Sequence, residues 1–420
     1  MQEPASEQAR VHHTVVIVGG GAAGISVAAM LRRRRRRISI AIIEPSDTHA
    51  YQSGWTMVGA GQLALKETLR PEAELIPPNV TWIRAAVARL LPDENAVVLE
   101  DGGRIVYGYL IACPGLALRW DRIEGLRDAL GHNGVCSTSS AVGAAYSWSC
   151  IRSFVGGVAL FTQPATPGRS TAAAHNIMCL AADHWRRAGR LEHSRIAFCV
   201  AGQTLFGVPF FVPALQNVID RYGITTRYGQ ELIAIDGRTR MATFRTIDAD
   251  GTARNVRHKF DMIHVTPPRG PPDIIRHSSL ADASGWIAVD HASLRHVRYG
   301  NVFGLGDAVG TGNAGSAAAV RMQVPVVSRN LLALLAGKPM PASYDGYDAW
   351  PLTTSIGRAM LAESTHDGAI TPSLPLDPRI PRRIAWWLKM RVLPGLYWDK
   401  MLRGKKPTIR HRQRRFGRGE

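Results

Sequence analysis

Cysteine is scarce in this sequence: five occur among 420 residues, and no two of them form a C-x-x-C pair. They are Cys113, Cys136, Cys150, Cys179 and Cys199. This spacing fits neither a zinc site nor a disulfide framework, so we expect no bound metal.

Long apolar runs are also missing. No stretch reaches the about eighteen uninterrupted apolar residues that a membrane-spanning helix needs. The first ten residues are polar and include two glutamates, unlike a signal peptide or a transit sequence. We therefore expect folding in the cytoplasm, with two or three closely associated domains for a chain of this length.

Acidic residues are few where basic residues gather. The net charge is +18, and from Arg379 onward fourteen Lys or Arg face only Asp399 and Glu420, a net charge of +12. Such a block attracts nucleic acid or lipid headgroups. A second basic run, residues 32–37, is interpreted as a solvated helix end, where cations favour the C-terminal dipole.

A dinucleotide-binding pattern is present at the start of the chain. The β-branched run 14–18 predicts a buried parallel strand. Gly19, Gly21 and Gly24 then satisfy G-x-G-x-x-G at the turn into a helix over 25–31. The first glycine permits the tight turn, the second lets backbone approach a pyrophosphate, and the third lets helix and strand pack closely.

Glu44 completes this pattern. It ends a second buried run, 38–43, about twenty residues after the glycines, where a carboxylate can bind ribose hydroxyls. Strand, glycines, helix, strand and acid in this order predict a dinucleotide site.

Two later segments indicate which dinucleotide cofactor to expect. The strand-like runs 157–162 and 194–200 flank a helical stretch, but the second is followed by residues 201–203, Ala-Gly-Gln, rather than a glycine triad. NAD(P) therefore lacks an obvious phosphate cradle. Asp307 ends the buried run 301–307 before an apolar helix that continues through Leu334. In FAD-binding doubly wound proteins such an acid meets the ribityl chain, which favours flavin.

The last segment is aromatic and basic. Residues 384–393 and 396–403 are predicted to be short amphipathic pieces broken by Pro394 and Gly395. Trp and Tyr suit the headgroup zone, and Lys and Arg reach lipid phosphates. Core packing of these aromatics is the alternative, and nucleic acid is a weaker third because no binding module accompanies the charge.

These features predict an α/β fold with two Rossmann-like dinucleotide-binding domains, parallel sheets and a C-terminal amphipathic, membrane-associating segment. The expected divisions are 12–133 for the first domain, 134–290 for the second without a glycine triad, 291–370 for the return to the first, and 371–420 for the basic segment.

Several stretches together resemble the sulfide:quinone oxidoreductases, in the branch that includes the mitochondrial enzyme. The similar segments run from about Val15 to Arg403. They are 51–52, 55–56, 58–61, 134–137, 161–167, 206–208, 264–268, 271–273, 301–307, 344–347 and 396–398.

The resemblance implies one FAD, a small electron donor such as sulfide, a membrane quinone as acceptor, and a monotopic seat in one leaflet. The cofactor contacts that we expect are Gly19, Gly21, Ala22, Ala23, Gly24, Glu44, Gln52, Val87, Ala112, Gly115 and Asp307. The location expected is peripheral, on a bacterial inner membrane, with no nucleic acid bound and a homo-oligomer as an option.

The family's redox-active cysteine pair is substituted here. Ser170 and Ala308 occupy the two positions, and a hydroxyl and a methyl can neither form a disulfide nor carry sulfane sulfur. Residues 313–319 also lack a lysine that the family has beside the flavin. Cys136 matches a third family cysteine and is a catalytic candidate, against the alternative of a buried apolar residue. His175 could face the same cavity, but a solvated helix histidine is the safer interpretation.

The predicted function is an FAD-dependent oxidoreductase of this family, passing electrons from sulfide or a related small reductant to a quinone. The alternatives are a diverged member that acts on another donor and a non-catalytic FAD-binding protein at the membrane.

Overall fold

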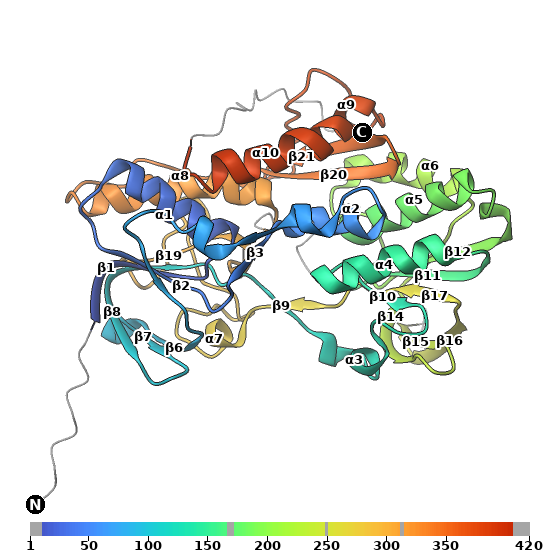
Figure 1. Ribbon diagram of the computed structural model, residues 1–420, viewed down its shortest axis with the longest axis horizontal. Helices are drawn as coiled ribbons and strands as arrows, with labels where there is room; N and C mark the ends of the chain where they lie inside the picture. Colours follow the sequence, from blue (N-terminus) through green and yellow to red (C-terminus); the bar gives the residue numbers. More distant parts are fainter. Residues whose placement is uncertain (1–10, 166–171, 248–250, 311–314, 406–420) are drawn as a thin grey trace, which may run out of the picture.

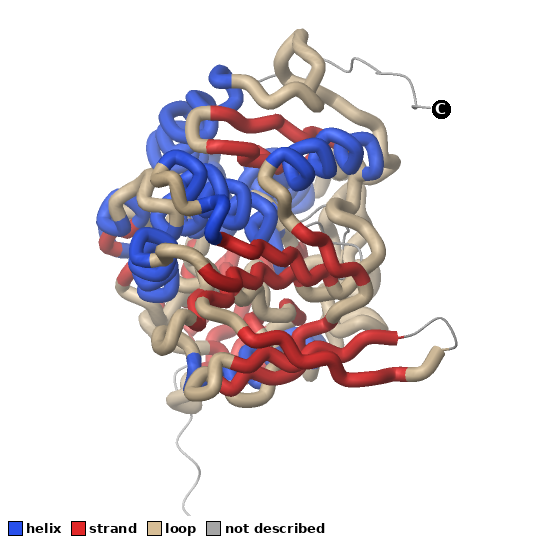
Figure 2. Tube along the Cα trace, turned by 90° about the vertical axis from the view of Figure 1, so that its right-hand side faces the viewer, coloured by secondary structure: helices blue, strands red, loops and turns tan. Residues whose placement is uncertain are grey.

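The computed structural model describes residues 11–165, 172–247, 251–310 and 315–405. Two units, one built on a mostly parallel sheet and the other on an all-parallel one, lie side by side, and a C-terminal helical layer crosses above both (Figure 1). Turned by a quarter, the molecule shows most of its strands in the lower half and most helices above them (Figure 2).

The first unit is built on a sheet with β1 near its centre. The strand order is β5 (Thr81–Ile83), β2 (Ile40–Ile43), β1 (Val11–Val18), β8 (Arg104–Ala112), β7 (Ala96–Leu99) and β6 (Val87–Leu91), and β19 (Val302–Gly304) also pairs with β8. The pairs of β1 with β2 and β8, and of β19 with β8, are parallel. Val15, Val16 and Ile17 are fully buried because helices cover this sheet, so the β-branched run has no polar face.

Two long helices lie together over this sheet in Figure 1, α1 (Ala22–Arg34) and α8 (Ala317–Leu334). The last turn of α1 holds Arg32, Arg33 and Arg34. This placement confirms the basic run as a helix end, where cations meet the negative end of the dipole.

The second unit contains an all-parallel sheet in the order β10 (Val135–Cys136), β17 (Met262–His264), β11 (Gly157–Gln163), β12 (Ser194–Val200) and β13 (Thr225–Tyr228). An antiparallel sheet of β14 (Glu231–Asp236), β15 (Met241–Ile247) and β16 (Ala253–Lys259) adjoins it. Its larger helices are α4 (Ala141–Ser153), α5 (Ala172–Arg187) and α6 (Val212–Arg221). The predicted α/β class with two parallel-sheet units is confirmed.

The chain crosses between the units twice, and the two crossings pair with each other. β9 (Ala117–Leu118) runs out and β18 (Arg269–Gly270) runs back, antiparallel. From Ile275 the returning chain packs in the first unit's core, together with Leu280 and Ile287. The return therefore precedes the boundary expected at residue 290, because these buried apolar side chains have their partners in the first core.

A hairpin and a helical segment form the upper layer. The hairpin is β20 (Asp348–Ser355) with β21 (Arg358–Ser364). The segment comprises α9 (Arg383–Trp387), a π-helical stretch over Leu388–Val392, α10 (Leu393–Gly395) and a second π-helical stretch over Leu396–Met401. We call Arg383–Met401 the C-terminal helical segment. The remaining short elements are β3 (Thr48–Ala50), β4 (Leu69–Pro71), α2 (Trp55–Gly59), α3 (Leu126–Ala129) and α7 (Asp273–Arg276).

The break expected at Pro394 and Gly395 is absent, and that prediction was wrong. Pro394 lies inside the continuous helical run, between two π-helical stretches whose altered hydrogen-bond pattern accommodates its missing N–H. Gly395 keeps helical angles, φ −64° and ψ −40°. None of the described helices is both long and apolar enough to cross a membrane.

Candidate functional site

The turn between β1 and α1 is shaped by its glycines. Gly19 has φ +101°, and a Cβ there would lie 2.5 Å from the carbonyl oxygen of Cys113. A Cβ on Gly24 would lie 1.9 Å from the oxygen of Gly19, so helix and turn meet backbone to backbone. A Cβ on Gly21 would meet no described heavy atom within 4 Å. Gly19 thus provides the left-handed turn and Gly24 the close helix–strand packing that the pattern predicts, while the space beside Gly21 holds no described heavy atom.

The N-terminus of α1 is open toward ligands. Its N-cap residue is Gly21, which has no side chain to cap the first turn. The first N–H groups of a helix lack intrahelical partners and carry the positive end of the dipole. Gly21 and Ala22 line a cavity, so their amides form a seat for an anion such as a pyrophosphate.

Glu44 is held beside this turn. Its Oε2 accepts a hydrogen bond from the Gly20 N–H at 2.7 Å, and its Oε1 accepts one from the Ser46 N–H at 2.9 Å. Each carboxylate oxygen keeps a further lone pair for a ligand hydroxyl. The sequence prediction for Glu44 therefore coincides with a fixed acceptor on the cavity wall.

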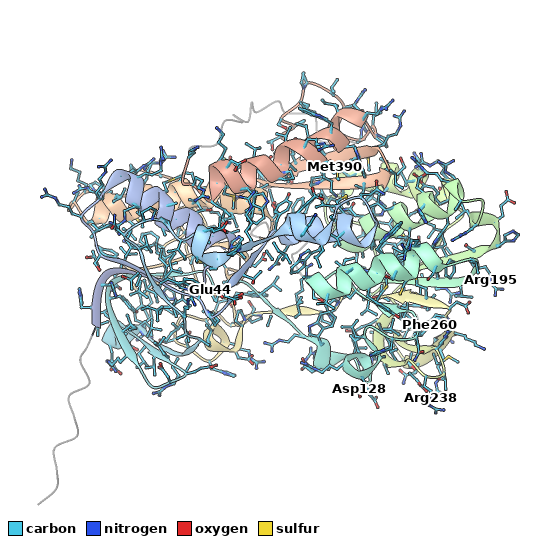
Figure 3. All side chains as sticks on the ribbon, in the orientation of Figure 1. Glu44, Asp128, Arg195, Arg238, Phe260 and Met390 are labelled. Atoms are coloured by element: carbon cyan, nitrogen blue, oxygen red, sulfur yellow. The ribbon has the colours of Figure 1, made fainter. Side chains whose placement is uncertain are left out.

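The cavity has a volume of about 810 Å³, within the range of sites for cofactors and drug-sized ligands. Glu44 lines it from the first unit and Met390 from the C-terminal helical segment above, and Figure 3 labels both. The residues predicted to bind the cofactor that line it are Gly19, Gly21, Ala22, Ala23, Glu44, Gln52, Gly115 and Asp307.

Three predicted cofactor residues lie outside the lining. Gly24 is buried beneath the turn, Ala112 is fully buried at the end of β8, and Val87 lies on β6 opposite Leu99. Gly24 and Ala112 support the lining residues from below. Val87 belongs to the antiparallel side of the sheet, which the sequence pattern does not locate.

The second helix end at the cavity belongs to α8. Ser316 accepts hydrogen bonds from the N–H groups of Ala318 and Ala319, both at 3.1 Å, and its hydroxyl donates to buried Asp348. Burial raises the pKa of Asp348 to about 8. Asp307 and Arg269 line the cavity nearby; burial lowers the pKa of Arg269, and the charge of Asp307 opposes this shift.

The upper part of the cavity contains ionisable groups that the sequence analysis missed. Lys389 donates from Nζ to the carbonyl oxygen of Pro351 at 3.3 Å, and burial lowers its pKa to about 7. Glu363 accepts from the Tyr347 hydroxyl at 2.6 Å, and burial raises its pKa. The sequence could have indicated Lys389, because a lysine among apolar side chains that become buried needs a polar partner nearby.

The cysteine positions do not supply a dithiol in the described cavity wall. Ala308 is fully buried next to Asp307, and Ser170 lies outside the described residues. All five cysteines are described, and Cys113 alone among them lines the cavity. Its thiol donates to the oxygen of Gly19 at 3.7 Å, and burial raises its pKa.

Cys136, the catalytic candidate, is fully buried at the end of β10 and does not line the cavity. Burial raises its pKa, so the thiol is protonated, and Cys150 is its hydrogen-bonding neighbour. Cys179 and Cys199 are fully buried as well.

His175 is not the solvated histidine that we expected. It is 2% exposed on α5, its Nε2 lies 3.4 Å from the Sγ of Cys179, and burial lowers its pKa to about 4. The helix pattern misled because α5 is covered by β20, an element distant in sequence. Among the described residues no group of three or more His, Cys, Asp or Glu side chains is placed to hold a metal.

The aromatic residues of the last segment divide between core and surface. Tyr397 is 6% and Trp398 4% exposed, both in the first unit's core, so for them the core-packing alternative is confirmed. Trp387 is 52% and Ile384 41% exposed. Only the first part of the segment presents apolar side chains to the surroundings.

Comparison with known proteins decides the family. A family model described as lycopene cyclase protein matches residues 14–71, which hold the glycine turn and Glu44. The mitochondrial sulfide:quinone oxidoreductase of Dictyostelium discoideum is 38% identical over 368 residues, 87% of this chain and 80% of that protein. The mouse protein of that name is 35% identical over 366 residues, 87% of this chain and 81% of that protein. The chain belongs to the sulfide:quinone oxidoreductase family. It is an FAD-dependent oxidoreductase of that family, which confirms the resemblance.

Solved structures agree on the fold. The sulfide:quinone oxidoreductase of Aquifex aeolicus superposes with a TM-score of 0.78 at 18% identity, covering 95% of this chain and 93% of that one. A chain in the mitochondrial ATP synthase structure of Tetrahymena thermophila gives a TM-score of 0.84 at 19% identity, covering 97% and 100%. At such identities the likeness concerns the fold alone.

Proposed function

We propose that the chain transfers electrons from sulfide or a related small reductant to a membrane quinone through one bound FAD. The observation that carries this proposal is a single cavity with two unlike ends. One end has the amides of the β1–α1 turn and the carboxylate of Glu44, and the other has apolar residues of the C-terminal helical segment. A dinucleotide suits the first end, and an isoprenoid quinone suits the second.

The residues present fit the cofactor. The uncapped N-terminus of α1 would hold the pyrophosphate, Glu44 the ribose hydroxyls, and Asp307 the ribityl chain beside the N-terminus of α8. When bound, the flavin supplies two-electron redox chemistry between donor and acceptor. The protein's part is to hold it, orient it and place protonated groups near its substrates.

The acceptor end offers a proton donor. Leu388, Val392, Leu393 and Leu396 line the cavity with apolar surface around Lys389. Reducing a quinone to a quinol consumes two protons, and a group with pKa near the working pH donates efficiently. The pKa of Lys389, about 7, meets that condition.

The donor end differs from the family pattern. With Ala308 and Ser170 at the cysteine positions, donor oxidation cannot proceed through a protein disulfide there. The donor would therefore react at the flavin directly. This substitution also favours a second candidate function, oxidation of another small reductant by the same route to quinone.

Anaerobic titration of the purified holoprotein tests both candidates. Sulfide is added while the flavin absorbance is followed, and a short-chain quinone is then supplied. Bleaching followed by reoxidation supports sulfide:quinone oxidation. No bleaching by sulfide, with bleaching by another small reductant, would contradict the sulfide assignment and support the second candidate. NADH serves as the control reductant, and rapid bleaching by it would contradict the expectation that NAD(P) does not bind.

The membrane proposal rests on the surface around α9. Ile380, Ile384 and Trp387 are 47%, 41% and 52% exposed, and Arg383 and Arg391 are exposed nearby. Apolar side chains flanked by cations suit a monotopic seat on anionic lipid.

Substitution tests this surface better than truncation, because removal of the whole segment would also remove the core residues Tyr397 and Trp398. Replacing Ile384 and Trp387 by serine should release the protein from anionic vesicles in a sedimentation assay. Val142→Ser, at a residue 80% exposed elsewhere, is the matched control. Unchanged binding by the double variant would contradict the proposed membrane face.

A further inference from the structure

Three side chains from distant parts of the chain form one line of hydrogen bonds along the cavity wall. His49 Nδ1 lies 3.1 Å from Glu72 Oε2, and His49 Nε2 lies 2.7 Å from the hydroxyl of Tyr397. Glu72, His49 and Tyr397 are 1%, 3% and 6% exposed, and all three line the cavity. The proposed electron transfer uses none of them.

The direction of donation follows from the chemistry of the groups. An ionised carboxylate only accepts, so Nδ1 of His49 donates to Glu72. In the neutral imidazole the other nitrogen then accepts, so Tyr397 donates its hydroxyl proton to Nε2. Burial raises the pKa of Tyr397, which keeps that proton in place. With Glu72 ionised and His49 neutral, donation runs from Tyr397 through His49 to Glu72.

At the Glu72 end, this line of hydrogen bonds reaches the turn between β1 and α1. Glu72 Oε1 lies so close to Gly20 that a Cβ there would come within 2.5 Å of it. Oε1 has no hydrogen-bond partner among the described residues, and the carboxylate is held through Oε2 by His49. The N–H of the same Gly20 holds Glu44. Glu72 Oε1 and the carboxylate of Glu44 therefore lie beside the same glycine of the turn.

At the Tyr397 end, this line of hydrogen bonds contacts the C-terminal helical segment. The Tyr397 ring lies 4.7 Å from that of Tyr51, and the Trp398 ring lies 5.7 Å from that of His49. Arg70 lies over Trp398 at 4.3 Å, a cation–π contact. These contacts bring the end of the segment against residues next to the dinucleotide turn.

We infer that seating of the C-terminal helical segment and binding of the dinucleotide stabilise each other through Tyr397, His49 and Glu72. Tyr397 is a positioning residue in this coupling. A seated segment fixes Glu72 against the turn that receives the dinucleotide, and a bound dinucleotide fixes the turn against which Glu72 rests. By linkage, each event strengthens the other by the same factor. This inference rests on the proposed FAD site. If FAD binds there, the C-terminal helical segment, which bears the exposed apolar side chains, is more firmly seated when the cofactor is bound.

The first experiment removes a single hydroxyl. In Tyr397→Phe the ring contacts remain, but the donor to His49 is lost. We expect the FAD dissociation constant of the refolded apoprotein, followed by flavin fluorescence, to rise about three- to tenfold. The matched control is Tyr222→Phe in the second unit. It removes a hydroxyl that donates to the carbonyl oxygen of Thr354 at 3.0 Å. Its dissociation constant should stay within twofold of the wild-type value.

The second experiment uses the unsubstituted protein and measures the segment itself. Limited trypsin digestion of apoprotein and FAD-loaded protein is followed by mass spectrometry for cleavage after Lys389 and Arg391. We expect cleavage at these sites at least threefold faster in the apoprotein, with a smaller difference in Tyr397→Phe.

The outcomes separate this inference from the proposed function. If FAD binds but its dissociation constant is unchanged in Tyr397→Phe, or if cleavage is equally fast in both forms, the coupling is overturned while the FAD site stands. A wild-type protein that binds no FAD would overturn both, and neither measurement depends on sulfide or quinone.

Discussion

Lys389→Met is the most informative single change in this protein. The substitution keeps an unbranched side chain of similar length and removes the charge. The lysine pKa falls from an ordinary 10.5 to about 7 in the folded protein because the ammonium is desolvated. Between these two values the unfolded chain binds a proton that the folded protein does not, so stability rises with pH across that window.

The magnitude follows from those two values. Raising the pH from 6 to 9 should add about 2–3 kcal/mol to the unfolding free energy of the wild type through Lys389 alone. Lys389→Met lacks this contribution. The stability of the variant relative to wild type should therefore be greatest at pH 6 and fall by about that amount by pH 9, since other titrating groups cancel in the difference.

Guanidinium unfolding of both proteins at pH 6, 7, 8 and 9 measures this difference. Lys400→Met, at an exposed lysine of the same segment, is the control for the loss of a lysine charge without burial. A difference for Lys389→Met that stays constant within about 0.5 kcal/mol from pH 6 to 9 would refute the desolvation argument.

The same variant tests the proton-donor role. Reoxidation of the reduced flavin by quinone should slow about 100-fold in Lys389→Met, as expected on loss of a general acid, while reduction by the donor keeps its rate. Equal reoxidation rates for wild type and variant in stopped-flow measurements would show that Lys389 is not the proton donor to the quinone.

Three further outcomes follow from the site. Glu44→Gln should raise the FAD dissociation constant about tenfold, because a charge-assisted acceptor for ribose hydroxyls becomes a neutral one; equilibrium dialysis measures it, and an unchanged value would contradict the ribose assignment. Gly24→Ala places a Cβ 1.9 Å from the Gly19 oxygen and should cost about 1–3 kcal/mol of stability, whereas Gly300→Ala, with no described heavy atom within 4 Å of its Cβ, should cost little in the same thermal unfolding assay. Cys136→Ala should leave the rate of flavin reduction by the donor within twofold, because Cys136 does not line the cavity; a large loss in stopped-flow bleaching would restore it as a catalytic residue.

The predictions that the structure bears out concern features encoded within short windows. Gly19 and Glu44 lie 25 residues apart, and a turn this tight leaves few alternatives to glycine. The parallel strands β11 and β12 follow from apolar runs of strand length. Local sequence determines such features because local sterics and burial patterns determine them.

The predictions that the structure corrects depend on what packs against a segment. His175 was expected to be solvated, but α5 is covered by β20. Pro394 was expected to break the segment into two pieces, yet it lies within a continuous helical run between two π-helical stretches. Tyr397 and Trp398 resemble a headgroup-binding pair, and contacts with His49 and Tyr51 draw them into the core instead.

By itself the sequence determined the class of fold, the glycine turn between β1 and α1, and the family. Only the tertiary structure decided that Lys389 and Glu44 share one cavity, that Cys136 lies outside it, and that Tyr397 reaches Glu72 through His49. The physical reason is distance along the chain. Tyr397 and His49 are separated by 348 residues, and no local pattern encodes a contact that folding alone creates.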